Sequence, residues 1–106
     1  TAANVNSKTI SLVVGDGATT ITLSTSGALA LNGANWKIRA VIIHQIADDG
    51  QEYSSEFHSS SALLTTTVGF GTVNLPDASA WTIQTRGTGT LTNDIVCKGL
   101  SVDWIP

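Results

Sequence analysis

The chain has 106 residues, enough for one domain built around one hydrophobic core. Charged residues make up 12% and the net charge is −3, so five basic side chains cannot neutralise a nucleic-acid backbone over several contacts. The longest strongly apolar run, 40–43, is too short to cross a membrane, and one cysteine cannot form an internal disulfide.

Apolar residues alternate with polar ones between clusters of Gly, Asn, Asp and Pro, a pattern typical of half-buried strands joined by turns. A first strand is predicted over 8–14, a second over 19–25, and a short element over 28–31. Residues 1–7 carry few apolar side chains and are predicted to be an N-terminal arm, either flexible or lent to a neighbour. The rest of the chain, 8–106, is predicted to be the β-sandwich domain.

The clearest strand is predicted over 35–46, and its two faces differ. One face carries a row that should point into the core: Trp36, Ile38, Ala40, Ile42, His44 and Ile46. The opposite face begins charged and becomes apolar at Val41 and Ile43. Half of this strand is therefore predicted to be covered on both sides, by the same chain or by another subunit, which makes Val41 and Ile43 candidate interface residues.

A turn at 48–50 leads into the polar segment 51–61, predicted to be an edge strand or a long loop. Two aromatic residues, Tyr53 and Phe57, anchor this segment and are further candidate interface residues. Apolar residues of the next segment, 68–75, occur on both parities. The glycines between them predict a β-bulge that shifts the register.

Two more strands are predicted, over 81–85 and over 95–105. One face of the last strand would carry Val96, Leu100, Val102 and Trp104 and close the domain. Seven or eight short strands predict an all-β fold, a single antiparallel β-sandwich or jelly roll. The predicted core-packing residues are Trp36, Ile38, Ile42, Trp81, Ile83 and Trp104.

The sequence contains few candidates for catalytic or metal-binding residues. His44 belongs to the core row and His58 to a polar stretch, and no Gly-x-Ser-x-Gly motif occurs, so no catalytic residue is predicted. Neither histidine is paired with a nearby ligand as in a zinc site, and Cys97 is predicted to be a small buried hydrophobe. The acidic turn at Asp48, Asp49 and Glu52 lacks the spacing of a calcium loop. No metal and no cofactor are predicted.

Each tryptophan begins or ends a predicted strand with apolar partners two residues away. This arrangement favours packing in a core or an interface, and an exposed platform that stacks on a sugar is the alternative.

Two stretches, NWKIRAVIIHQIADDGQEYSSEFHSS (35–60) and DASAWTIQTRGTGTLTNDIVCKGLSVDWIP (77–106), resemble a β-sandwich domain that recurs in tail-fibre, head-fibre and capsid decoration proteins of tailed bacteriophages. The resemblance implies packing roles for Trp36, Trp81 and Trp104. It further implies a non-enzymatic virion protein, made in the host cytoplasm, that forms a homo-oligomer, a trimer by analogy. A capsid decoration or cement protein that binds the major capsid protein is expected. A fibre-type module that binds a receptor or a cell-surface glycan is the alternative.

Overall fold

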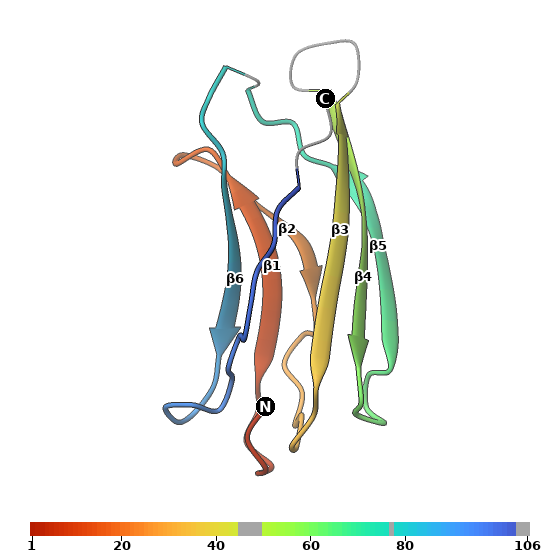
Figure 1. Ribbon diagram of the computed structural model, residues 1–106, viewed down its shortest axis with the longest axis vertical. Coiled ribbons are helices and arrows are strands. Elements are labelled where there is room, and N and C mark those ends of the chain that lie inside the picture. The colour runs from red at the N-terminus through yellow and green to blue at the C-terminus, as the bar shows by residue number, and fades with distance from the viewer. Residues whose placement is uncertain (45–49, 77, 104–106) are drawn as a thin grey trace.

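The computed structural model describes residues 1–44, 50–76 and 78–103, and within them the chain is all-β with no helix (Figure 1). Two antiparallel three-stranded sheets, with the orders β2-β1-β6 and β3-β4-β5, form a body of 46 × 24 × 21 Å. The strands are β1 (Thr9–Gly15), β2 (Thr20–Thr25), β3 (Trp36–His44), β4 (Gln51–Ser59), β5 (Thr66–Thr72) and β6 (Thr82–Thr88). In this part of the chain no helix is long and apolar enough to cross a membrane.

The hairpin between β1 and β2 is closed by the side chain of Asp16. Its carboxylate accepts hydrogen bonds from the backbone N–H groups of Thr19 at 2.7 Å and Ala18 at 2.9 Å. These bonds, the one from Thr19 first, hold the pKa of Asp16 below its ordinary value. The next residue, Gly17, has a φ of +94°, a conformation that a side chain would disfavour. The turn between β1 and β2 is therefore built by two residues in succession.

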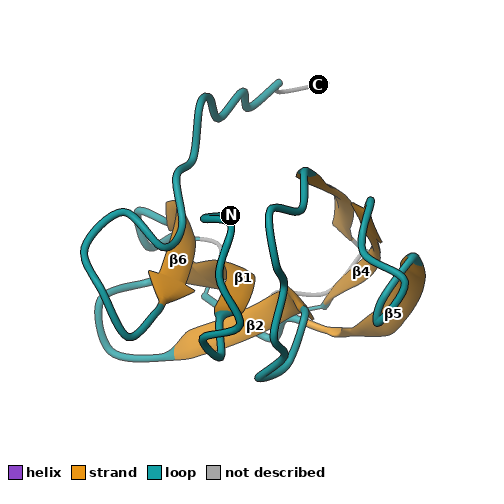
Figure 2. Ribbon diagram, turned by 90° about the horizontal axis from the view of Figure 1, so that it is seen from below, coloured by secondary structure: helices purple, strands orange, loops and turns teal. Residues whose placement is uncertain are grey.

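The two sheets meet along β2, which packs against β3, β4 and β5. On the opposite side β6 and β3 lie apart, and Figure 2 shows the sheets opening towards that side. One core cluster contains Leu12, Val14, Leu23, Val73 and Leu75. A second contains Ile10, Leu31, Ala34 and Phe57. The core is thus closed along β2 and thinner between β6 and β3.

The polar segment predicted as an edge strand or loop is β4, the central strand of its sheet. Its buried polar side chains bond to backbone groups. Gln51 donates to the carbonyl of Leu75 and accepts from the N–H of the same residue, at 2.8 and 3.1 Å. Ser55 donates to the carbonyl of Leu23. Burial of polar side chains in this strand is acceptable because backbone groups satisfy them.

The prediction of a bulge in 68–75 is wrong. The β4–β5 ladder is regular, and Val68 and Phe70 point outwards. The inward positions are glycines because β4 side chains fill that space: a Cβ on Gly69 would lie 2.7 Å from Ser55 Oγ, and one on Gly71 would lie 2.8 Å from Tyr53 Cε1. The bulge that does occur lies between Leu12 and Val13, in the pairing of β1 with β2.

The predicted core residues of β3 and β6 are half-buried. Trp36, Ile38, Ile42, Trp81 and Ile83 pack against the two clusters, and Trp104 lies outside the described residues. Phe57, predicted as an interface residue, is wrong in that role, because it is fully buried in the second cluster. Tyr53 is half-buried against the first cluster, and its hydroxyl lies 3.4 Å from the carbonyl of Thr22.

Both ends of the described chain differ from the structure that the sequence predicts. The predicted arm, 1–7, lies against the body: Ala2 donates to the carbonyl of Asp94 and Gly33 donates to the carbonyl of Ala2, at 2.8 and 2.9 Å. The prediction of a last strand over 95–105 is wrong for the residues that the structure describes. Residues 95–103 lie outside every strand that the structure describes. Val96, Leu100 and Val102 are exposed and do not close the domain.

Candidate functional site

The outer face of β3-β4-β5 is formed by the alternate side chains that point away from the other sheet. β3 contributes Lys37, Arg39, Val41 and Ile43; β4 contributes Glu52, Ser54, Glu56 and His58; β5 contributes Thr66, Val68, Phe70 and Thr72. The antiparallel registers place these residues in four cross-strand rows, so neighbours from three separate segments form one surface.

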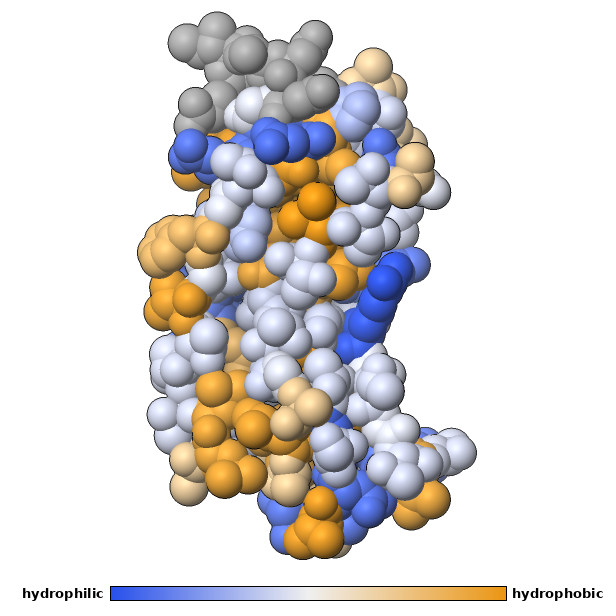
Figure 3. All heavy atoms as spheres, turned by 180° about the vertical axis from the view of Figure 1, so that it is seen from behind, coloured by the Kyte–Doolittle hydropathy of each residue, from blue (hydrophilic) through white to orange (hydrophobic). Residues whose placement is uncertain are grey.

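One half of the outer face is apolar. Val41 of β3 and Phe70 of β5 lie in one row on either side of Ser54, with Ile43 and Val68 in the adjoining rows. All four are exposed, with Phe70 at 75% and Ile43 at 61%. The space-filling view in Figure 3 shows hydrophobic surface on the side of the molecule where β5 runs. Aromatic and branched side chains left in water on a sheet suit contact with another molecule.

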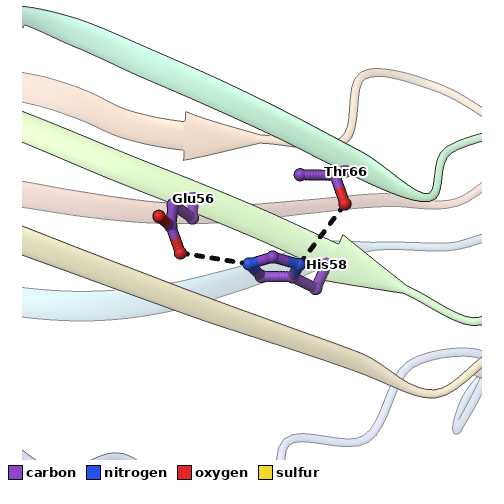
Figure 4. Close-up of polar contacts among 3 residues, drawn as sticks. All are labelled: Glu56, His58 and Thr66. Atoms are coloured by element: carbon purple, nitrogen blue, oxygen red, sulfur yellow. Dashed lines mark hydrogen bonds and ion pairs between the residues drawn. The ribbon is translucent and has the colours of Figure 1, made fainter.

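The other half of the outer face is polar (Figure 4). His58 lies between Lys37 and Thr66 in its row. Its Nε2 is 3.1 Å from Glu56 Oε2, and its Nδ1 is 3.4 Å from Thr66 Oγ1. A proton on Nε2 would let the ring donate to Glu56 and accept from Thr66, so both contacts are compatible with one neutral tautomer.

The order hydroxyl, imidazole and carboxylate also occurs in hydrolase triads. The side chains of His58 and Glu56 are half-exposed on the outer face of β4. Catalysis by such a trio depends on a dry, concave setting and on donors aimed at a developing charge. We assign these residues to the polar half of the outer face, where they hold each other in position.

The metal-ligand candidates that lie within the described residues do not come together. Among the residues that the structure places, no group of three or more His, Cys, Asp or Glu side chains could hold an ion. The prediction for Cys97 is wrong, because its thiol is exposed, and His44 is exposed at the end of β3. Asp48 and Asp49 of the acidic turn lie outside the described residues.

A shallow, open pocket of about 260 Å³ lies at the other end of the molecule from the apolar half of the outer face. Its lining includes Trp36 of β3, Arg86 of β6 and, from the following loop, Asn93 and Asp94. Arg86 donates from Nε and Nη2 to Gln84 Oε1, at 3.2 and 3.1 Å, so its guanidinium is already held by a neighbour. An indole beside polar groups is the arrangement that recognises sugars, and this pocket is the second candidate site.

One wall of this pocket is held by a buried polar network that sequence reasoning missed. Lys8 is fully buried, and its Nζ donates to Asn4 Oδ1 at 2.7 Å, to the carbonyl of Asn6 at 3.0 Å and to that of Asn4 at 3.2 Å. All three ammonium donors therefore have an acceptor, which is what makes burial of a lysine tolerable.

Asp94 completes the network. It accepts from Asn4 Nδ2 at 2.9 Å, from the N–H groups of Leu91 at 2.9 Å and Thr90 at 3.0 Å, and from Asn6 Nδ2 at 3.4 Å. The bond from Asn4, followed by that from Leu91, holds the pKa of Asp94 below its ordinary value. The one signal in the sequence was Asn93-Asp94 in a turn, because short polar side chains there often bond to nearby backbone.

Comparisons with protein-family models, with curated proteins and with solved structures find no match to this chain.

Proposed function

We propose that this protein is a non-enzymatic structural protein of a tailed-phage virion, a capsid decoration or cement protein that binds the major capsid protein through the outer face of β3-β4-β5. The observation that carries the proposal is the exposure of Val41, Ile43, Val68 and Phe70 on one face of one sheet. The virion assignment itself comes from the sequence resemblance over residues 35–106.

The composition of the outer face supports a protein partner. Its apolar half adjoins charged residues of β3 and β4, which are Lys37, Arg39, Glu52 and Glu56. Protein interfaces commonly combine an apolar centre with a polar rim, and aromatic residues are enriched at their centres. A small ligand, in contrast, prefers a concave site, and the pocket described above lies elsewhere, beside Trp36 and Arg86.

Many copies on one shell would strengthen a contact that is small for each copy. A decoration protein faces a surface that repeats across the capsid, so an oligomer engages several sites together and gains avidity without further contacts. We further propose that the assembled protein has the seven or eight strands of a β-sandwich or jelly roll. It would be made in the host cytoplasm and would function on the virion.

The test is binding to capsid shells of the phage whose genome encodes this chain. Phe70→Asp and Val41→Asp should each reduce binding by about tenfold or more, because a charge would be desolvated at the centre of the contact. Thr82→Asp, an exposed change on the other sheet, is the matched control and should bind like the wild type. Wild-type binding by both outer-face variants would overturn the proposal, as would failure of the wild type to bind shells.

The second candidate function is a fibre-type module that binds a receptor or a cell-surface glycan. The observation that favours it is the half-buried indole of Trp36 at a pocket that Arg86 and Asn93 also line. Binding there should change tryptophan fluorescence and weaken in Arg86→Ala, while Phe70→Asp should leave it unchanged. A glycan array without signal for the wild type would count against this candidate.

A further inference from the structure

Residues 95–103 have the alternating sequence pattern of a strand, but they belong to neither sheet. Ile95 packs beside Gly87 at the end of β6, and Thr85 Oγ1 lies 3.5 Å from the thiol of Cys97. Beyond this point the chain leads away from both sheets, as Figure 2 shows. Side chains on one parity are more than half exposed: Val96 at 52%, Leu100 at 51% and Val102 at 59%.

The backbone of this segment is available for pairing. Within the described part of the chain, no backbone–backbone hydrogen bond joins residues 95–103 to another segment. The N-terminal residues, in contrast, are bonded to Gly33 and Asp94. Three of the four even positions from 96 to 102 are apolar, and the backbone of the segment has no backbone partner in the described chain. Both features suit a strand that adds to the edge of a sheet.

The same molecule presents such an edge. In the sheets as described, β3 pairs with β4 alone, so its other edge is open. The inward side chains of β3 face the core but are only half-buried: Ile38, Ala40 and Ile42. The reason is that no strand lies between β3 and β6 to cover them. An added strand would supply backbone partners to β3 and cover this row at once.

We propose that residues 96–103 of one copy pair, antiparallel, with the free edge of β3 in a second copy of this chain. A register with Asp103 beside Lys37 places Val102 beside Ile38 and Leu100 beside Ala40. The two apolar side chains then cover the half-buried row, and the carboxylate meets an ammonium on the outer face. Lys98 falls beside Ile42, from which its long side chain reaches solvent.

A second copy is the favoured occupant because donor segment and acceptor edge belong to one chain and complement each other in length and charge. Each copy leaves its own segment in water and its own edge unpaired. Reciprocal exchange closes a dimer, and head-to-tail exchange around a ring closes a trimer. This inference uses none of the apolar side chains of the outer face and does not depend on binding to a capsid.

The experiment is a disulfide cross-link between two chains that each carry Cys97→Ser. One chain carries Ala40→Cys and the other Leu100→Cys; opposed positions in an antiparallel pair lie close enough for a disulfide. Mixing the two under oxidation should give a covalent heterodimer. In the control pair, the second chain carries Gly99→Cys in place of Leu100→Cys. Position 99 points to the opposite face, so the yield should fall about tenfold.

Two further measurements make the outcome decisive. Sedimentation of the full chain should show a dimer or trimer, and Leu100→Asp with Val102→Asp should shift it to the monomer while the chain keeps the strand signal of its six own strands in circular dichroism. A monomeric wild type, or equal cross-linking of the control pair with Gly99→Cys, would overturn the inference. A chain carrying both Ala40→Cys and Leu100→Cys that forms only an internal disulfide would overturn it too, because the segment would then close its own sheet. None of these readouts involves shells, so they fail or succeed separately from the proposed function.

Discussion

Asn4 donates a hydrogen bond of 2.9 Å to the carboxylate of Asp94, which lies 90 positions later in the chain. The same amide group accepts, through Oδ1, from the buried ammonium of Lys8 at 2.7 Å. A single side chain thus links a buried cation to a buried carboxylate. Every buried side-chain nitrogen and oxygen among the described residues has a partner. Removal of one member should therefore leave other groups unsatisfied.

Asp94→Asn should lower the midpoint of urea unfolding at neutral pH, because an amide replaces an acceptor of four hydrogen bonds with one that can accept only on one oxygen. The pKa of Asp94 is lowered by folding, so its contribution is present above the ordinary value of 3.8 and is lost as the pH falls through the folded-state pKa. The variant should accordingly lose less stability on acidification than the wild type. Glu52→Gln, on an exposed carboxylate, is the control; identical pH profiles for Asp94→Asn and wild type would contradict this prediction.

Gln51→Glu should destabilise the fold by about 3 kcal/mol at neutral pH, because the buried group could no longer donate to the carbonyl of Leu75. Burial favours the protonated carboxyl and raises the pKa of the new glutamate. Stability of the variant should consequently increase as the pH falls from neutral to about 4, where protonation restores a donor. Urea unfolding at both pH values measures the change, and a variant equally stable at the two would refute the assignment.

The two phenylalanines should respond in opposite ways. Phe57→Ala should cost about 3–5 kcal/mol of unfolding free energy, because it opens a cavity in the second core cluster. Phe70→Ala, at an exposed position, should change stability by about 0.5 kcal/mol or less. Thermal and urea unfolding distinguish the two. Similar losses would mean that Phe70 is covered within the chain and is not free to bind a partner.

Gly71→Ala should destabilise by about 1–3 kcal/mol, because its Cβ would lie 2.8 Å from the ring of Tyr53 and something must shift. Gly99→Ala is the matched control: no atom lies within 4 Å of its added Cβ, so stability should be unchanged. Adding Tyr53→Leu to Gly71→Ala should recover part of the loss, since it removes the crowded ring. Additive losses in the double variant would show that the ring is not the cause.

The alternation of apolar and polar residues was sufficient to predict the all-β fold and most of its strands. Strands predicted over 8–14, 19–25 and 81–85 correspond to β1, β2 and β6 within a few residues. This success has a local cause, because side chains of a strand point to opposite faces at every step and the period appears in the sequence itself. The same rule placed Val41 and Ile43 on the face opposite to the core row; within this chain both are exposed, and their cover by another subunit stays a prediction.

Tertiary structure alone decided which side chains of β4 and β5 are covered and which polar groups are paired. Phe57 and Phe70 look alike in the sequence, yet one fills the core and the other lies in water, because the neighbours of β4 and β5 come from distant segments. The partners of Lys8 and Asp94 are likewise set by long-range contact. Residues 95–103 show the limit most clearly: their strand pattern is real, but pairing also requires an open edge within reach, and the sequence does not show where that edge lies.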